Sequence, residues 1–305
     1  MIKTTFSIKD LENLSGIKAH TIRIWEKRYS LFTPERTDSN IRRYDTNALQ
    51  RILNVSYLNN NGNKISAIAA MDDCQLEAEV KKHAEKGNTT NHSLQEIKLA
   101  MVNFDKNLFN RVFNTGLKEL GFQGVFREIL IPFLIELGHL WHSNTINVAH
   151  EHFISHLIKQ KLLSHMEHVD YQPDEQHKEL YILFLPQNEM HDLGLLFLNY
   201  ELLSRGRETL YLGTYMTLEA LEHFQNKGKK LVYITYITVD PTIKKVPKFL
   251  KQFEKNVNKN GNSDLWILGQ MVAKMKDLKL NPTHKTFDSI EQLINGLETS
   301  KKLEH

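Results

Sequence analysis

The chain has 305 residues, of which 41% are hydrophobic and 25% are charged, as in ordinary globular proteins of about two or three domains. Its single cysteine, Cys74, excludes an internal disulfide framework and a cysteine metal cluster. The sequence starts without an apolar run of signal-peptide type, and no stretch approaches the length of a membrane span. We therefore expect a cytoplasmic protein that has no membrane partner. The closing Leu303-Glu304-His305 is typical of an expression tag.

Positive charge is concentrated at the start of the chain. Residues 1–70 hold eleven Lys and Arg against six Asp and Glu, a net charge of +5. The other 235 residues hold twenty-eight against thirty, a net charge of −2. This asymmetry predicts a polyanion-binding surface in the first 70 residues, although charge alone would also fit a merely solvated face.

The basic segment begins with a predicted helix-turn-helix. Ser7 is placed to cap a helix over residues 8–14, and Gly16 breaks the chain before a second helix over residues 18–29. Trp25 of the second helix is predicted to lie in the core rather than on a contact surface. The basic side chains of that helix then point away from the core.

A hairpin and further helices follow. Turn residues at 38–40 separate two short extended runs that carry arginines, which predicts a β-hairpin wing. Asp45 is placed to cap a third helix that runs to residue 59, and a fourth is expected over residues 65–71.

Segments 21–29, 34–36 and 42–45 together resemble the signature of MerR-family DNA-binding domains. The resemblance covers residues ~5–72 of a predicted winged-helix DNA-binding domain over residues 1–75. It implies that the second helix enters the major groove of double-stranded operator DNA while the wing contacts the flanking backbone. The candidate contact residues on the helix are Arg23, Lys27, Arg28 and Tyr29, and those on the wing are Arg36, Arg42 and Arg43.

Residues 92–170 are predicted to form a four-helix bundle after a polar linker at 87–93. Apolar residues recur at helical spacing through this segment. A sustained heptad pattern is missing, so the coiled-coil dimerisation that is common among MerR-type regulators is not expected here.

Seven of the fifteen histidines lie between residues 139 and 168 of the bundle, and one cluster stands out. Trp141 and His142 are predicted to end one helix, and Glu151 and His152 to begin the next after a bend. These four side chains would then surround one cavity. The alternatives are a solvated helix end with incidental histidines, or a divalent metal on His152 and His156 that lacks a clear third ligand.

After a second linker at 170–175, strands and helices alternate. Strands are predicted at 180–185, 209–212, 231–237, 265–268 and near 285–287, and helices at 193–204, from 218, and at the end of the chain. This alternation predicts a Rossmann-like, doubly wound parallel sheet over residues 177–300. Such sheets bind ligands at the carboxyl ends of their strands, at a topological switch point.

The loop after the first of these strands carries His191. One ring nitrogen could bind a metal centre while Glu189 or Asp192 orients the other, and Gly194 would let the next helix pack closely on the sheet. A loop histidine that is simply solvated is the plain alternative.

The spacing of Glu189, His191 and Gly194 resembles the signature of cobalamin-binding Rossmann-like domains, which usually have Asp first. The resemblance implies that His191 replaces the cofactor's own base as the lower cobalt ligand. In the family a Ser-x-Leu and a Gly-Gly follow. The corresponding residues here are Thr235-Tyr236-Ile237 and Gly269-Gln270, so Gln270 stands where a glycine borders the channel for the nucleotide tail.

The order of a MerR-type head, a bundle and a cobalamin-type domain resembles the CarH/LitR-type photoreceptor regulators, which carry Trp-His and Glu-His at the spacing of residues 141–152. The resemblance implies that Trp141, Glu151 and His152 surround the adenosyl group of adenosylcobalamin. His142 would bind cobalt from above after light breaks the cobalt–carbon bond. It further implies a repressor that binds its operator as a homo-oligomer, a dimer or tetramer, in the dark.

Two other functions remain open at this point. The first is a regulator of the same fold that has lost cobalamin binding and responds to another ligand or a protein partner. The second is an enzyme, a corrinoid carrier for methyl transfer, which would share the His191 loop but has no use for a basic winged helix. We therefore expect a regulator rather than an enzyme.

Overall fold

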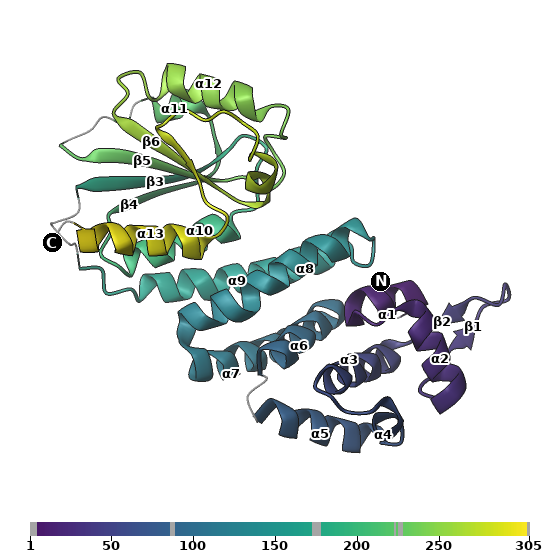
Figure 1. The fold of residues 1–305 in the computed structure, drawn as a ribbon. Helices are drawn as coiled ribbons and strands as arrows, with labels where there is room; N and C mark the ends of the chain where they lie inside the picture. Colours follow the sequence, from purple (N-terminus) through teal and green to yellow (C-terminus); the bar gives the residue numbers. More distant parts are fainter. Residues whose placement is uncertain (1–4, 86–88, 173–177, 223, 225–227, 304–305) are drawn as a thin grey trace. The chain divides into compact units, whose positions relative to one another are not determined.

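The structure, a computed structural model, describes residues 5–85, 89–172, 178–222, 224 and 228–303. Backbone contacts divide the chain into two compact units, residues 1–158 and 159–305. In Figure 1 the first unit runs from purple to teal and the second from teal to yellow. Within the described ranges, no helix is both long and apolar enough to cross a membrane. The boundaries of the three sequence-derived domains remain predictions.

The head of the first unit is a winged helix-turn-helix, as the sequence predicts. Its elements are α1 (Ile8–Ser15), α2 (Ala19–Tyr29), β1 (Glu35–Arg36), β2 (Arg42–Arg43), α3 (Thr46–Asn60), α4 (Ile65–Ala69) and α5 (Asp73–Glu85). Ser7 caps α1 through a reciprocal capping box, and Asp45 caps α3. Gly16 ends α1 with a φ of 75°, a left-handed conformation that glycine adopts without strain.

The helical segment that follows consists of α6 (Thr89–Asn103), α7 (Lys106–Gly124), a π-helical turn (Val125–Leu130), α8 (Ile131–His142) and α9 (Val148–Glu167). Gly121, with a φ of 68°, divides α7 from the turn that leads into α8. The predicted linker at 87–93 is wrong from Thr89 onward, because those residues begin α6; residues 87–88 lie outside the described ranges.

Tertiary packing explains why this polar stretch is helical. The His92 ring meets Tyr57 of α3 edge-on, with 5.4 Å between the ring centroids, and His92 Nδ1 lies 3.4 Å from Glu96 Oε2 one turn later. Ser93 is buried. Packing against α3 therefore outweighs the loop-like composition of the segment.

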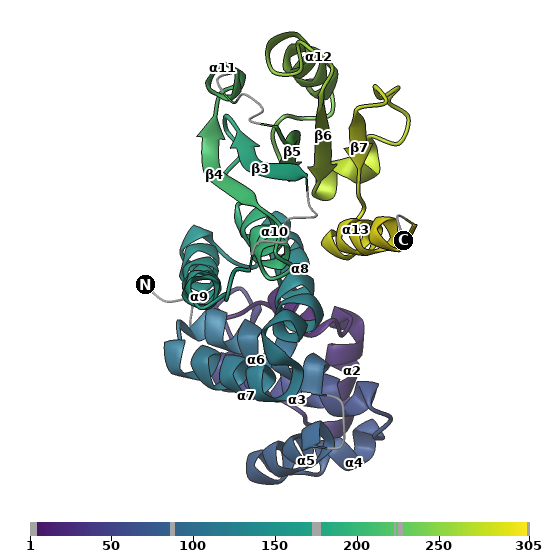
Figure 2. The ribbon, with the colours of Figure 1, turned by 90° about the vertical axis from the view of Figure 1, so that its left-hand side faces the viewer.

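The second unit is built on a five-stranded parallel sheet, as predicted. Its strands are β3 (Glu179–Pro186), β4 (Thr209–Met216), β5 (Lys230–Tyr236), β6 (Ser263–Leu268) and β7 (His284–Thr286), in the order β4-β3-β5-β6-β7. Figures 1 and 2 show α10 (Leu193–Leu203) and α13 (Ile290–Leu303) on one face, and α11 (Leu218–Leu221) and α12 (Val246–Asn256) on the other. Of the predicted second linker, residues 173–175 lie outside the described part.

Strand order places the switch point of this sheet between β3 and β5. From β3 the chain moves outward to β4, and it then crosses back to β5 on the other side of β3. Ligand sites of doubly wound sheets lie in the crevice outside the carboxyl ends of such a strand pair. The loops that follow Pro186 and Tyr236 therefore meet where a ligand is expected.

Two helices were not assigned from the sequence. In α5, Leu76 and Val80 are buried, and in α12 the residues Val246, Phe249, Leu250 and Phe253 are. The i, i+3, i+4, i+7 spacing of the α12 residues predicts a helix whose apolar face covers the sheet. Periodicity alone could have revealed it.

Candidate functional site

The loop after β3 holds His191 in one orientation. The Nδ1–H of His191 donates to Glu189 Oε1 at 2.5 Å, so Glu189 rather than Asp192 orients the ring. The side chain of His191 is 44% exposed. With Nδ1 carrying the hydrogen, Nε2 is the nitrogen whose lone pair can reach a metal centre, which is the usual arrangement of a metal-ligating histidine and its carboxylate.

Glu189 is fully buried and joins the two loops at the switch point. Its Oε1 also accepts from the backbone N–H of Met190 and of His191, at 2.9 and 3.1 Å. Its Oε2 accepts from the backbone N–H of Thr238, Val239 and Asp240 in the loop after β5, at 2.9, 2.7 and 3.2 Å. The carboxylate thus fixes both loops at once.

The hydrogen bonds also set the charge of this group. Burial by itself would raise the pKa of the Glu189 carboxyl. The bonds from the His191 side chain and from the backbone N–H of Val239, His191 and Thr238 outweigh burial and lower the pKa to about 2. Glu189 is therefore an anion at neutral pH, and it stabilises a ring that donates through Nδ1.

The surroundings of His191 combine an ion pair with exposed apolar side chains. Asp192 forms an ion pair with Lys159 of α9 in the same unit. Met190, Tyr215 and Val239 belong to the segments at the carboxyl ends of β3, β4 and β5, and each is more than half exposed. Large exposed apolar side chains at the ends of neighbouring strands and in the loops that follow mark a surface suited to an apolar ligand.

The remaining sequence-predicted residues of this unit do not gather at one point. A Cβ added to Gly194 would lie 2.7 Å from Cζ of Tyr236, so the glycine is required by the Tyr236 ring. Thr235 alternates with Tyr236 along β5, so it points to the opposite face of the sheet from Tyr236. The Thr235 hydroxyl is buried and has no hydrogen-bond partner within the described residues.

Gly269 brings the loop after β6 close to the loop after β5. It has a φ of 103°, and an added Cβ would lie 2.3 Å from the carbonyl oxygen of Ile237. Only glycine fits there, because both the conformation and the close approach exclude a side chain. Gln270, the next residue, is exposed.

In the first unit, Trp141 and His142 end α8, and Glu151 and His152 lie in the first turn and a half of α9, as the sequence predicts. Trp141 is 43% exposed, His142 and His152 are exposed, and Glu151 is half-buried. Among the described residues no hydrogen bond or ion pair joins these four side chains, so they form an open surface rather than a closed network.

The metal alternative gains no third ligand. The rings of His152 and His156 lie 6.0 Å apart on one face of α9. In the part of the chain that the structure describes, no group of three or more His, Cys, Asp or Glu side chains could hold an ion.

The loop between α8 and α9 is anchored to the head. Thr145 is buried in this loop, and its hydroxyl accepts from the Asn13 side chain of α1 at 2.7 Å. Its neighbour His150 pairs with Asn147 Oδ1 at 2.8 Å and stacks on Phe104 at 4.7 Å between ring centroids. The loop between the two pairs of candidate residues is therefore in direct contact with a helix of the helix-turn-helix head.

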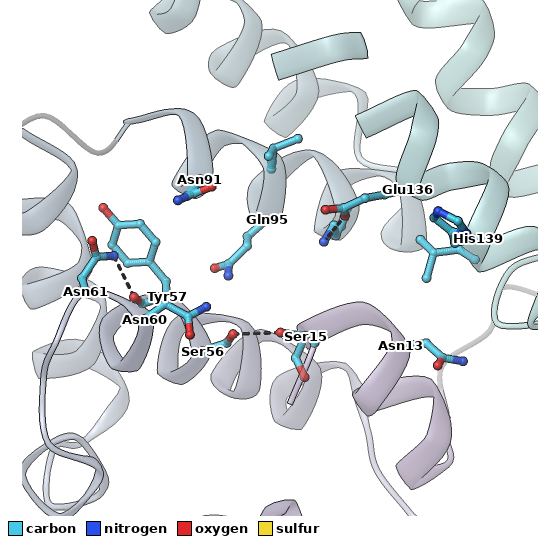
Figure 3. A pocket seen from close by; sticks show the side chains of 14 residues that line it. Asn13, Ser15, Ser56, Tyr57, Asn60, Asn61, Asn91, Gln95, Glu136 and His139 are labelled. Atoms are coloured by element: carbon cyan, nitrogen blue, oxygen red, sulfur yellow. Dashed lines mark hydrogen bonds and ion pairs between the residues drawn. The ribbon is translucent and has the colours of Figure 1, made fainter. Parts of the chain in front are cut away.

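A cavity of about 360 Å³ lies beside this contact, between the head and α6 and α8. Figure 3 shows amide and hydroxyl side chains around it, including Asn60, Asn91 and Gln95, and the bond from Ser56 Oγ to the Ser15 carbonyl. Neither Trp141 nor His142 lines this cavity, so it is separate from the predicted cofactor surface.

The predicted DNA-contact residues are mostly available on the surface of the head. Arg23, Lys27, Arg28, Arg36 and Arg43 are exposed, and Trp25 is 8% exposed, which confirms its place in the core. Arg42 differs, because its Nε donates to Glu26 Oε2 of α2 at 3.0 Å, and Tyr44 donates to the other oxygen of Glu26. Glu26, which was not predicted, therefore fixes the wing against the recognition helix.

Sequence reasoning missed several of these residues. Only the structure identifies Met190, Tyr215 and Val239, through their exposure at the carboxyl ends of the strands. It identifies Tyr236 through the contact with Gly194. The one signal that the sequence offers is the bulk of Tyr236 between Thr235 and Ile237.

Comparison with known proteins agrees with this arrangement. Residues 6–73 match the MerR HTH family of regulatory proteins, and residues 93–163 match the B12 binding domain family. The chain is similar to two Myxococcus xanthus proteins, the HTH-type transcriptional repressors CarH and CarA. It is 29% identical to CarH over 72% of this chain and 75% of CarH, and 25% identical to CarA over 72% of this chain and 71% of CarA. The monomethylamine corrinoid protein of Methanosarcina barkeri, 13% identical, shares the fold with a TM-score of 0.56, over 69% of this chain and 99% of that protein.

Proposed function

The chain joins a MerR-type helix-turn-helix domain to a B12 binding domain, and from this premise we propose that it is a transcriptional repressor whose binding to operator DNA depends on a corrinoid. The observation that carries the proposal is the orientation of His191 by the buried Glu189 carboxylate at the switch point of the sheet. A cytoplasmic location, where the DNA is, belongs to the same proposal.

The residues of the second unit fit a corrinoid on its lower side. His191 would supply the lower nitrogen ligand through Nε2, because Glu189 holds the hydrogen on Nδ1. Met190, Tyr215 and Val239 would cover apolar parts of the flat ring system. When bound, the corrinoid supplies a cobalt–carbon bond that light can break.

On the bundle side, Trp141, His142, Glu151 and His152 are proposed to contact the upper face of the cofactor, and an adenosyl corrinoid, of which adenosylcobalamin is the common example, is the proposed form. Support comes from their exposure at the α8–α9 corner and from the CarH-type spacing of the two residue pairs. The contact of Asn13 with Thr145 gives a direct connection from this corner to the head.

The test is a visible absorption spectrum of protein reconstituted with adenosylcobalamin and, separately, with adenosylcobinamide, recorded in the dark and after green light, with DNA binding measured in both states. A histidine-ligated spectrum that changes with light, together with weaker DNA binding after light, is the expected result. Gel filtration without retained corrinoid would overturn the proposal. It would favour the alternative of a regulator of the same fold that has another ligand or a protein partner.

We propose homo-oligomer formation, as dimer or tetramer, as the way the dark state reaches two or more operator half-sites. Small rigid-body changes between domains can assemble or dismantle such oligomers. A corrinoid carrier enzyme remains the second candidate because of the fold shared with a corrinoid protein. The winged helix, with its exposed basic residues, favours the regulator.

The DNA-binding part predicts separable effects of two arginines. Arg28→Ala on α2 is expected to weaken DNA binding by about 1–3 kcal/mol, as for an arginine that reads a base edge. Arg43→Ala on the wing is expected to lower the salt dependence of binding by about one charge, as for one lost phosphate contact. The affinity loss of Arg28→Ala is measured with a duplex from the promoter of the gene that encodes this chain. The salt dependence of Arg43→Ala is measured with a mixed-sequence duplex across a salt series.

Two further variants make this test specific. Arg111→Ala removes the same charge from the exposed surface of α7 and should leave DNA binding unchanged. Arg42→Ala breaks the ion pair with Glu26, so it should act through displacement of the wing rather than through the salt slope alone. Unchanged isotherms for both Arg28→Ala and Arg43→Ala would contradict the assigned DNA surface.

A further inference from the structure

One face of the sheet in the second unit is filled with aromatic rings between the strands and α10. Tyr181, Trp266 and Tyr236 share this face, since the register pairs Tyr181 with Val232 and Trp266 with Ile234, and alternate residues of β5 point to the same side. Trp266 meets Tyr181 at 5.8 Å and Phe287 at 5.3 Å between ring centroids. The Trp266 Nε1–H is buried and finds no hydrogen-bond partner in the described part of the chain.

Tyr236 closes the end of this face that lies nearest to His191. It is the last residue of β5, and the tip of its ring occupies the open side of Gly194, three residues after His191. A methyl group on Gly194 would lie 2.7, 2.8 and 3.0 Å from three ring atoms of Tyr236, closer than ordinary contacts. Tyr236 is half-buried, and burial raises the pKa of its hydroxyl.

This placement matters for the shape of a corrinoid. In cobalamin a nucleotide tail, tethered to the ring, ends in the base that otherwise binds cobalt. If His191 takes the lower position, that tail must leave cobalt and enter the protein beside the histidine loop. Gly194 has no side chain and so leaves space between β5 and the start of α10. The Tyr236 ring occupies that space.

We propose that Tyr236 is a specificity-determining residue that favours corrinoids without a nucleotide tail, the cobinamide class, over complete cobalamins. The inference rests on the proposed corrinoid binding and narrows its ligand. Gln270 stands where the family pattern has a glycine, but it is exposed. We therefore assign the obstruction of the nucleotide tail to Tyr236.

The test compares dissociation constants of aquocobinamide and aquocobalamin for the full chain, measured by equilibrium dialysis and by absorption spectra. The wild-type protein is expected to bind cobinamide at least ten times more tightly than cobalamin. Tyr236→Ala, which opens the space beside Gly194, is expected to remove most of that difference by strengthening cobalamin binding. Cobinamide has no base of its own, so its nitrogen-ligated spectrum reports the protein histidine directly.

Two control variants separate a specific opening from general loosening. Tyr236→Phe keeps the ring and should keep the wild-type preference. Tyr181→Ala removes a buried ring from the same face near the start of β3 and should lower thermal stability without changing the preference. Thermal unfolding of all variants shows which of them are folded.

The possible results distinguish failure of the inference about Tyr236 from failure of the proposed function. Equal affinities of wild-type protein for both corrinoids, with histidine-ligated spectra, would overturn the inference about Tyr236 and leave the proposed function in place. A Tyr236→Ala protein that is folded and keeps the tenfold preference would also overturn it. Failure of the folded wild-type and Tyr236→Ala proteins to bind either corrinoid would overturn the proposed function, and the inference with it.

Discussion

His191→Ala protein is expected to lose the nitrogen-ligated spectrum of bound cobinamide and more than about 100-fold in corrinoid affinity, because removal of groups that only support a metal ligand already costs 10–100-fold. The fold should survive, since the ring is 44% exposed and Glu189 keeps its five bonds to backbone N–H groups. Spectral titration with aquocobinamide and thermal unfolding of the same samples measure the two effects.

Glu189→Gln tests the support of the histidine. Both carboxylate oxygens act only as acceptors, whereas a glutamine must turn its NH₂ group toward donors on one side. The clash should lower the free energy of unfolding by about 3 kcal/mol or more, since each unsatisfied buried group costs about 1–3 kcal/mol. Corrinoid affinity should fall about 10–100-fold.

The matched control is Asp192→Asn, which makes the same chemical change three residues further along, at an ion pair with Lys159 that is nearer the surface. It should cost about 1 kcal/mol or less. A His191→Ala protein that retains cobinamide with a nitrogen-ligated spectrum would show that another residue is the ligand. If Glu189→Gln and Asp192→Asn lose equal amounts of unfolding free energy and corrinoid affinity, Glu189 has no particular role in supporting His191.

Local signals in the sequence were sufficient for most of the fold. Ser7 and Asp45 cap helices where their side chains can reach the third residue on, and such short-range chemistry does not depend on the rest of the chain. The alternation of strands and helices defined the parallel sheet for a similar reason. The prediction of a linker was wrong from Thr89 to Ser93 because the helix there depends on contacts with α3, and amino-acid composition does not reveal such contacts.

In the candidate site, too, contacts between residues close in sequence could be predicted and contacts between distant residues could not. The pairing of His191 with a nearby carboxylate could be predicted, because both residues lie in one short loop. That Oε2 of Glu189 also binds Thr238, Val239 and Asp240 could not, since those residues are about fifty positions away. Tyr236 and Gly194 are likewise far apart in sequence, and only the packing of α10 on β5 shows that one ring requires one glycine.

The surface around α8 and α9 predicts that Trp141 and His142 have separate roles. Trp141→Ala should cost well under the ~3 kcal/mol of a buried tryptophan, because its side chain is 43% exposed rather than buried. This variant is expected to bind an adenosyl corrinoid yet fail to form the dark oligomer, if its flat ring shields the upper face of the cofactor as proposed. Ile135→Ala, which trims another exposed apolar side chain of α8, serves as the matched control.

His142→Ala is expected to leave dark binding and assembly intact and to change only the illuminated state, because its exposed imidazole at the end of α8 would contribute only after the adenosyl group has left. Size-exclusion profiles and spectra, dark and lit, with adenosylcobinamide and adenosylcobalamin in parallel, separate the roles. His142→Ala protein that fails to assemble in the dark would contradict the division. If both variants instead lose thermal stability, with the same profile in dark and light, the two residues only stabilise the end of α8, as the solvated-helix alternative requires.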